Sequence, residues 1–475
     1  MVKDNFDSRR KAYKKFINDK EFLTYIYMKQ ENNLELTKEE LRFIYEIDKD
    51  IEGFGFQEDP RIEEIKQGRN KKKDLANLYD CKEEEIGLTK EDFIKANNKG
   101  IRLKYYDNGL YLGNLRSAKN LFLPEIMNGN LKLPELKSTK DLFLPKIIIE
   151  GLSLESIKSA KGLEFPKKVR FLDLSGLESA EGLKLPEKLN GLCLAKLKNA
   201  KDLKIPETVK YLYLSDLKSA EGLKLPEEVE ILDLSSLESA KGLKLPEKLE
   251  SLDLSGLESA EGLYLPKRVK NLYLSSLKSA KGLELPKKVK ELYLTRLKNA
   301  EGLKLPEEVE ILDLSSLESA KGLKLPEKLK TLYLSRLKSA KGLELPEEVE
   351  NLYLGSMESA KDLKLPNGLI TLYLRSLESI EDLKLPKEVT ILFLNSLTSA
   401  EGLELPEEVE FLDLSSLTSA KGLELPEEVE YLKLSGLTSA EGLELPNGID
   451  MNNVDLPDNV KEELLFKTKV RQRSL

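Results

Sequence analysis

The sequence contains no histidine and only two cysteines, Cys81 and Cys193, in 475 residues. Without histidine, acid–base catalysis by imidazole, Ser-His and Cys-His nucleophile pairs and most zinc sites are excluded. Two cysteines in different regions of the chain also argue against a disulfide framework. These absences predict a protein that is not an enzyme and that uses no metal, other cofactor or small-molecule substrate.

Long apolar runs are absent as well, although 40% of the residues are hydrophobic. No run approaches the ~18 apolar residues of a membrane-spanning helix. Residues 1–30 hold no apolar segment of the kind that a signal peptide needs. A cytoplasmic location is therefore expected, with export by a non-classical route as the alternative. The glycines of the repeated region stand singly, so no phosphate-binding glycine loop is predicted.

A short repeat dominates what the sequence does contain. Its clearest copy is EGLKLPEEVEILDLSSLESA at residues 221–240, and the pattern recurs every 20 residues from residue 172 to residue 432. Earlier copies begin at Leu110, Leu131 and Leu152. A unit this short cannot bury its own apolar side, so neighbouring copies must stack on one another. The sequence therefore predicts a parallel β-solenoid of about 17 coils.

Each coil is expected to contribute to two parallel sheets. Apolar and polar residues alternate at residues 231–235, which predicts a strand with one buried side. A shorter alternation at residues 242–245, ended by Pro246, predicts a second strand on the opposite side of the coil. Lys and Glu also alternate at residue 161 and every twentieth residue to 301, which predicts ion pairs between adjacent coils.

The pattern VxxLxL at residues 229–234 resembles the LxxLxL core of the leucine-rich-repeat superfamily. The run LKLPEEVEIL at residues 303–312 is similar to the bacterial, BspA-like branch of that superfamily. Leu237 stands where the family has a buried asparagine, and a Ser column that includes Ser239 is suited to satisfy backbone groups at the turn instead. The resemblance implies the fold. It also implies a role in binding macromolecules, without naming the partner.

The limits of the repeat predict an α+β protein of three parts. Residues 1–102 are expected to form a helical domain, residues 103–446 the solenoid, and residues 447–475 a short helical cap with a basic tail. Helical caps are expected because the end coils would otherwise expose a sheet edge and an apolar cross-section. The first helix should reach Gln30 and the second about Asp50. Helix starts are marked by Asp7 or Ser8, Thr37, Pro60, Asn70, Thr89 and Pro457.

Two further hypotheses concern the helical part. Residues 75–86, after a basic run at residues 69–73, resemble the helix-turn-helix of DNA-binding domains. Three glutamates at residues 83–85 would face the phosphates, so a plain helical hairpin is favoured. Cys81 invites comparison with the nucleophile of bacterial ubiquitin ligases that carry leucine-rich repeats. Its acidic neighbours would raise its pKa and no histidine serves as base, so a buried or half-buried structural thiol is favoured.

The residue between the paired leucines points away from the core, so one column of side chains covers the open side of the longer sheet. Tyrosine and aspartate alternate in blocks along this Tyr/Asp column. Tyrosine combines rigid contact area with one hydrogen bond, which is typical of binding patches. The predicted partner-binding residues are Tyr213, Asp233, Asp253, Tyr273, Tyr293, Asp313, Tyr333, Tyr353, Tyr373, Phe393 and Asp413.

The same column has a purely structural explanation, because aromatic rings stacked between coils stabilise a parallel sheet without any partner. We therefore predict a scaffold for protein–protein interaction that recognises a protein partner through the Tyr/Asp column. The alternative is a structural, adhesion or self-assembly module in which the column only stacks. Carbohydrate binding on the aromatic residues is a third and weaker alternative.

The last coils are strongly acidic, with 12 acidic and 2 basic residues at 401–446. Like charges repeat from coil to coil, and their repulsion is either screened by solvent or relieved by a basic partner or by cations. This acidity argues against broad nucleic-acid binding. The acidic patch consists of Glu404, Glu407, Glu408, Glu410, Glu424, Glu427, Glu428 and Glu430.

Overall fold

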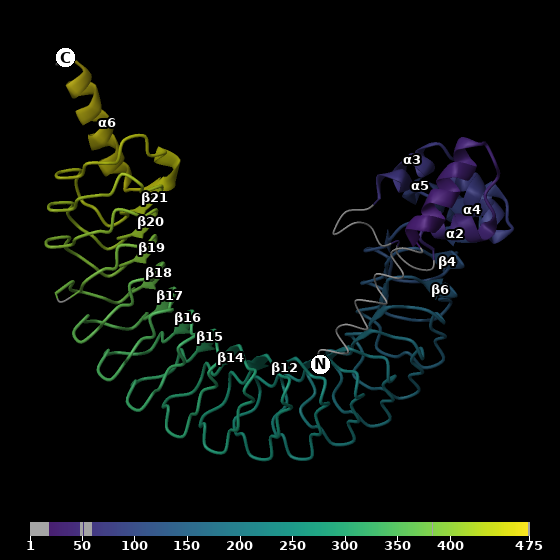
Figure 1. Cartoon of the computed structure of the whole chain (residues 1–475), viewed down its shortest axis with the longest axis horizontal. Helices are drawn as coiled ribbons and strands as arrows, with labels where there is room; N and C mark the ends of the chain where they lie inside the picture. The colour runs from purple at the N-terminus through teal and green to yellow at the C-terminus, as the bar shows by residue number, and fades with distance from the viewer. Residues whose placement is uncertain (1–18, 48–50, 52–58, 382, 474–475) are drawn as a thin grey trace. The chain divides into compact units, whose positions relative to one another are not determined.

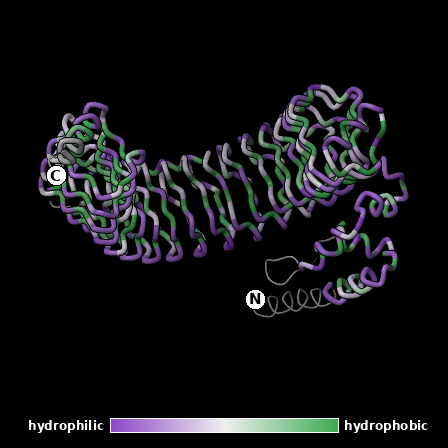
Figure 2. Tube along the Cα trace, turned by 90° about the horizontal axis from the view of Figure 1, so that it is seen from above, coloured by the Kyte–Doolittle hydropathy of each residue, from purple (hydrophilic) through white to green (hydrophobic). Residues whose placement is uncertain are grey.

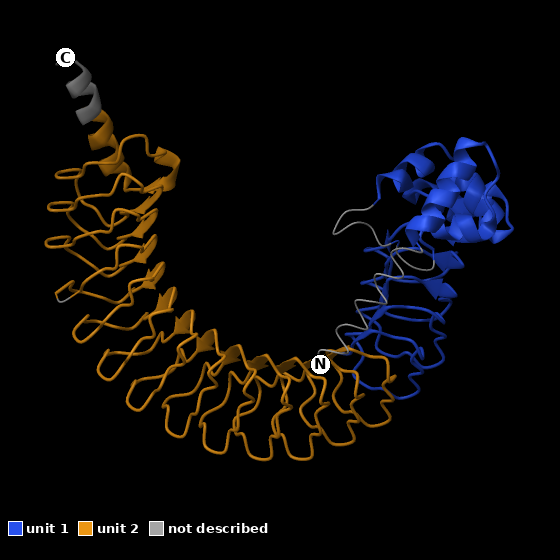
Figure 3. Ribbon diagram, in the orientation of Figure 1, with its two compact units in different colours: residues 1–194 blue, residues 195–475 orange. Residues whose placement is uncertain are grey.

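A computed structural model describes residues 19–47, 51, 59–381 and 383–473 (Figure 1). The chain forms two compact units, residues 1–194 and residues 195–475 (Figure 3). The predicted starts of the first helix, Asp7 and Ser8, lie outside the described residues. No described helix combines the length and the apolar character needed to cross a membrane.

Helices dominate the N-terminal part of the first unit. Residues 19–31 are helical. They are followed by α2 (Lys38–Ile44), α3 (Pro60–Gln67), α4 (Lys71–Tyr79) and α5 (Lys90–Asn98). The predicted capping box of α2 is present, because Thr37 Oγ1 accepts from the Glu40 N–H at 3.3 Å and Glu40 Oε2 accepts from the Thr37 N–H at 2.6 Å. The predicted extension of this helix to about Asp50 is wrong, since the left-handed φ of 51° at Glu46 is incompatible with a continuing helix.

The first unit contains two parallel sheets. One has the strand order β1 (Ile86–Gly87), β2 (Tyr105–Tyr106), β4 (Ile126–Met127) and β6 (Ile147–Ile148). The other begins with β3 (Leu110–Tyr111), β5 (Leu131–Lys132), β7 (Gly151–Ser153), β8 (Phe171–Asp173) and β9 (Gly191–Cys193). Strand β1 comes from the helical segment, and Leu41, Ile44 and Leu75 share one apolar cluster with Ile86 and Tyr105. The helices therefore cap the first coils, as predicted.

The second unit continues the repeat as a ladder of short parallel strands in which each residue pairs with the residue 20 positions later up to β21. Strand β22 pairs with β21 through Leu432 and Val454, beyond residue 446 where the repeat was predicted to end. Among the described residues, five such strands in the first unit and 13 in the second make 18, compared with the 17 coils predicted. The strands are β10 (Tyr211–Tyr213), β11 (Ile231–Asp233), β12 (Ser251–Asp253), β13 (Asn271–Tyr273), β14 (Glu291–Tyr293), β15 (Ile311–Asp313), β16 (Thr331–Tyr333), β17 (Asn351–Tyr353), β18 (Thr371–Tyr373), β19 (Ile391–Phe393), β20 (Phe411–Asp413), β21 (Tyr431–Lys433) and β22 (Val454–Asp455).

The repeated leucines form the core of each coil, and apolar and polar residues recur at the same places from coil to coil (Figure 2). Leu234 and Leu237 are fully buried, so leucine fills the place of the family's buried asparagine. Ser239 Oγ accepts from the Lys241 N–H at 3.3 Å, and the same bond recurs at Ser179, Ser219 and Ser259. The prediction that this Ser column satisfies backbone groups at the turn is confirmed.

The predicted second strand at residues 242–245 is wrong, because these residues belong to no strand. Hydrogen bonds there stay within the coil: the Leu243 N–H donates to the Ala240 carbonyl at 3.0 Å, and the Leu249 N–H donates to the Pro246 carbonyl at 3.3 Å. The second unit bends with its strands on the inner side, so its coils spread apart on the outer side (Figure 1). Sheet pairing needs a spacing of ~4.8 Å, and the continuous strands of this unit lie on the inner side.

Ion pairs between coils also occur in columns other than the predicted one. The predicted column, which begins at residue 161, contains one ion pair among its described residues. Lys161 Nζ and Glu181 Oε1 lie 3.4 Å apart. Lys210–Glu230 at 2.7 Å and Lys290–Glu310 at 2.6 Å flank the start of the strands. The pairs of the second unit thus gather near its inner side, where neighbouring coils are close.

Helix α6 (Asp458–Arg473) follows β22 and covers the last coil. Val460 is fully buried, and Glu463 Oε2 accepts from the Ala440 N–H at 2.7 Å. This agrees with the predicted C-terminal cap, although the helix is longer than the segment to Lys467 that the sequence indicated.

Candidate functional site

The Tyr/Asp column lies on the open side of the strands in the second unit, on the inner side of its bend (Figure 1). Register places each member directly beside the next, as in the pairs Tyr213–Asp233 and Tyr333–Tyr353. Most members are half-buried, whereas Asp413 is only 3% exposed and Phe393 only 8%. The structure therefore brings all eleven predicted residues into one column, in sequence order.

Aromatic members of the column stack face to face. Tyr273 and Tyr293 have ring centroids 4.7 Å apart and an interplanar angle of 10°. A longer aromatic run starts at Tyr333, with centroid distances of 4.3 Å to Tyr353, 4.4 Å from there to Tyr373, and 4.0 Å from Tyr373 to Phe393. Ring faces inside these stacks are covered by their neighbours, so the column presents mainly ring edges and hydroxyl groups.

The aromatic run continues beyond the column, through residues that were not among the predicted partner-binding residues. Asp413 interrupts the column, and Phe411 on the same strand takes the next place, 4.9 Å from Phe393. Tyr431 follows at 6.3 Å from Phe411. Residues two apart on a strand share a face, so the flanking aromatic residues at these positions were the available signal.

Aspartates in the column use their carboxylates to hold the turn that follows the strand. Asp233 Oδ1 accepts from the Ser235 N–H at 2.9 Å, and its Oδ2 accepts from the Ser215 hydroxyl of the preceding coil at 2.6 Å. Asp313 makes the same backbone contact and also accepts from Thr295 Oγ1 at 3.0 Å. These contacts cap the strand end and link coils, which is a structural role.

Three tyrosine hydroxyls of the column are not used in this way. Those of Tyr273, Tyr293 and Tyr373 donate to no residue that the structure describes. Burial, followed by the negative charge of Glu291, raises the pKa of Tyr293 to about 12. Burial and the neighbouring tyrosines raise the pKa of Tyr353 to about 12 as well. Tyr293 and Tyr353 therefore remain neutral at ordinary pH.

Two cations lie over rings of the aromatic run. The Arg375 guanidinium sits 5.4 Å from the Tyr373 ring centroid and 5.5 Å from that of Phe393. Lys433 Nζ lies 5.7 Å from the Phe411 ring and 3.8 Å from Asp413 Oδ2. Neither cation was among the predicted site residues.

The acidic patch lies in the last coils of the second unit, and all eight of its glutamates are exposed. None of them forms an ion pair with a residue that the structure describes. Glu427 Oε2 accepts from the Asn447 N–H at 3.1 Å. Screening by solvent and relief by a basic partner or by cations both stay predictions for these charges.

Residues 75–86 do not form the helix-turn-helix considered above. After α4 the chain makes a single turn of 3-10 helix, Glu83–Glu85, and then strand β1, so there is no recognition helix at these residues. Burial raises the pKa of the half-buried Cys81 thiol, and the charges of Glu85 and Asp80 raise it further. The favoured helical hairpin is therefore also wrong at these residues, because a strand follows α4 in place of a second helix. The raised pKa of Cys81 agrees with the favoured structural interpretation of that thiol.

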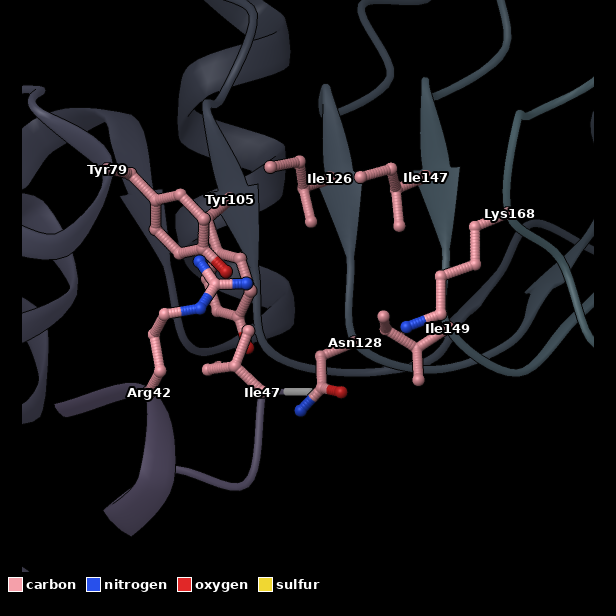
Figure 4. A pocket seen from close by; sticks show the side chains of 9 residues that line it. All are labelled: Arg42, Ile47, Tyr79, Tyr105, Ile126, Asn128, Ile147, Ile149 and Lys168. Carbon is pink, nitrogen blue, oxygen red and sulfur yellow. The ribbon is translucent and has the colours of Figure 1, made fainter. Parts of the chain in front are cut away.

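A hollow of about 230 Å³ lies in the first unit, where the helices meet the shorter sheet (Figure 4). Its walls include Tyr79 and Tyr105, whose rings stack at 4.8 Å, and the sheet residues Ile126 and Ile147. Lys168 lies at its other end (Figure 4). The hollow was not predictable from the sequence, because it depends on how far the helices cover the sheet. In the described part of the chain, no three acidic or cysteine side chains gather as a metal site would require.

Comparisons with known proteins give a likeness of fold. No family model matches the sequence, and no curated protein matches it. The structure is similar to that of YopM from Yersinia enterocolitica WA-314, with 18% identity, a TM-score of 0.50, and coverage of 78% of this chain and 95% of that chain. YopM from Yersinia pestis, described as a leucine-rich effector protein, gives 17% identity, coverage of 77% and 88%, and a TM-score of 0.33.

Proposed function

We propose that this chain, whose fold is that of the leucine-rich-repeat proteins, is a non-enzymatic scaffold that binds another protein through the Tyr/Asp column. The observation that supports this proposal is the state of the tyrosines. Their ring faces stack on one another, while the hydroxyls of Tyr273, Tyr293 and Tyr373 have no partner among the described residues. Rigid rings with free donors suit a protein interface, because little side-chain entropy is lost on binding.

Cohesion of the coils has other sources. Backbone bonds such as Leu234 N–H to the Asp253 carbonyl, at 2.9 Å, run from coil to coil, and ion pairs flank the strands. The structural alternative nevertheless has its own support in the Asp–Ser contacts and the ring stacks, which would exist without a partner. Carbohydrate binding is disfavoured, since a sugar ring stacks on an open aromatic face and these faces are covered.

Replacing Tyr273, Tyr293 and Tyr373 together by phenylalanine tests the proposal, because it removes three hydroxyls and keeps the ring stacks. Tyr264→Phe is the matched control, since Tyr264 is 83% exposed and belongs to no ring stack. The full-length chain and both variants would be used to capture proteins from native lysate. We expect one protein that the wild type and the control retain and the triple variant releases, at unchanged melting temperature. Equal retention by all three chains would count against the column as the binding surface.

The acidic patch is a second proposed contact region, for a basic segment of the same partner. Exchange of Glu407, Glu408, Glu427 and Glu428 for glutamine should weaken capture at low salt and leave the melting temperature unchanged or raised, because like-charge repulsion is removed. Retention that does not respond to these changes would remove the patch from the proposed interface.

A further inference from the structure

Arginine is rare in the coils of the second unit, where lysine fills nearly every basic position. Residues 195–446 contain four arginines, namely Arg268, Arg296, Arg336 and Arg375. The last three each follow a tyrosine of the Tyr/Asp column by two or three residues, after Tyr293, Tyr333 and Tyr373. Arginine differs from lysine in its planar fork, which stacks on aromatic rings and binds carboxylates through two parallel hydrogen bonds.

Arg375 is the best-defined of the three. Its guanidinium lies over the rings of Tyr373 and Phe393, yet the side chain is exposed. It forms no ion pair with any described residue, and the residues at its position in the two following coils, Asn395 and Ser415, are uncharged. Its fork is therefore held in place by stacking and remains available for an anion.

Arg296 and Arg336 lie in the turn after their strands. Their backbone N–H groups donate to carbonyls of the preceding coil, Arg296 to Ser275 at 2.9 Å and Arg336 to Ser315 at 2.8 Å. Both side chains are exposed, and neither is ion-paired to a described residue. Asp216, at the same position of an earlier coil, does pair with Lys198, 18 residues before it, at 3.0 Å.

The residue 18 positions before Arg296 is Lys278, which is already paired with Glu258 at 2.6 Å. For Arg336 the equivalent residue is Glu318, and the two do not pair in the structure. The residues at the same position in the coils on either side of Arg336, Ser316 and Ser356, are small. Nothing large therefore stands beside the two arginines along the stack.

We propose that Arg296, Arg336 and Arg375, together with the hydroxyls of Tyr293 and Tyr373, bind an extended acidic segment of the partner protein. This inference rests on the proposed function and names the chemistry of the partner at that same face. Neighbouring arginines of this set are two coils apart, which is ~10 Å at ~4.8 Å per coil. An extended peptide covers that distance in about three residues. The segment would therefore carry carboxylates at about every third residue.

A single-stranded nucleic acid fits the same surface less well. It binds through bases stacked on open aromatic faces together with a basic groove. Here the ring faces are covered by one another, and the coils that follow are strongly acidic. An acidic peptide requires only the ring edges, hydroxyls and arginine forks that the surface presents.

Fluorescence anisotropy with the full-length chain and labelled peptides of about 13 residues tests the inference. One peptide has Asp at every third position in a Gly/Ser background, a second has Lys at those positions, and a third has the same Asp residues adjacent to one another. The variant Arg296→Gln, Arg336→Gln, Arg375→Gln removes the three forks. The control variant Lys267→Gln, Arg268→Gln, Lys288→Gln removes three exposed positive charges elsewhere.

We expect the spaced Asp peptide to bind more tightly than the other two. The face variant should lose at least about tenfold in affinity and the control variant less than about twofold, with the loss greatest at low salt. Three lysines in place of the arginines should restore only part of the affinity. No binding of the spaced peptide at millimolar concentration, or equal loss in the two Gln variants, would overturn the inference. Tighter binding of the Lys peptide or of a single-stranded oligonucleotide would also overturn it.

The Tyr273→Phe, Tyr293→Phe, Tyr373→Phe chain separates this inference from the proposed function. If that chain loses the natural partner while the arginine variant keeps it, the column is a binding surface and the acidic chemistry is wrong. If neither chain loses the partner, the proposed function fails together with the inference.

Discussion

Replacing Tyr353 by alanine should destabilise the second unit through the loss of two ring stacks. Its ring lies 4.3 Å from that of Tyr333 and 4.4 Å from that of Tyr373, at interplanar angles of 18° and 26°. An aromatic pair contributes about 0.5–1.5 kcal/mol beyond the area it buries, so two pairs correspond to about 1–3 kcal/mol of unfolding free energy. Few substitutions on the solvent-facing side of a sheet would lower the unfolding free energy as much.

Urea unfolding followed by circular dichroism measures this loss, and amide hydrogen exchange over residues 331–373 shows whether it is local. Tyr264→Ala is the matched control, because Tyr264 is 83% exposed and stacks on no ring, so its effect should stay within about 0.5 kcal/mol. A double-mutant cycle with Tyr373→Ala should give a coupling energy of about 1 kcal/mol. If Tyr353→Ala were no more destabilising than Tyr264→Ala, the ring stacks would not contribute to the stability of this unit.

Three other expectations can be checked by thermal unfolding. The pKa of Tyr293 and of Tyr353 is raised to about 12, from an ordinary value of about 10. The unfolding free energy should therefore fall as pH rises from about 10 to about 12. It should fall less in the chain with both residues changed to Phe. Gly242 has a φ of +80°, with open space around an added Cβ. Gly242→Ala should therefore lower the unfolding free energy by about 1 kcal/mol through backbone conformation alone. Asp362 has a φ of 66°, so Asp362→Gly should raise the melting temperature. Lys270→Ala breaks an exposed ion pair with Glu250 at 2.8 Å and should change stability by less than about 0.5 kcal/mol at any salt concentration; a larger, salt-dependent loss would show that these columns hold the coils together.

The solenoid itself was predictable because every coil repeats the same local rules. Buried leucines such as Leu232, Leu234 and Leu237 and a hydroxyl at Ser239 follow from alternation and from the need to satisfy a turn N–H. The second sheet was predicted wrongly at residues 242–245, since alternation alone does not reveal that the bend separates the coils on that side. In the first unit, by contrast, the β-branched residues Ile147 and Ile148 do form a second strand in the coil, although it follows Pro145, whereas residues 242–245 precede Pro246.

The candidate site was predictable as a column but not as a chemistry. Register alone places Tyr333 beside Tyr353. It does not show that the Asp233 carboxylate accepts a hydrogen bond from the Ser235 N–H. Nor does sequence show that the aromatic run changes column at Phe411, or that Arg375 lies over two rings. These contacts depend on side-chain conformations, which repeat spacing does not fix.

Site-specific photo-crosslinking tests most directly whether the Tyr/Asp column binds a protein. Tyr373 would be replaced by benzoylphenylalanine, which keeps an aromatic ring in the stack, and Tyr264 on the outer side would be replaced likewise as the control. Irradiation in native lysate should give a covalent adduct with one protein from position 373 and none from position 264. Adducts of equal yield from both positions, or adducts from position 264 alone, would contradict the assignment of the column as the binding surface.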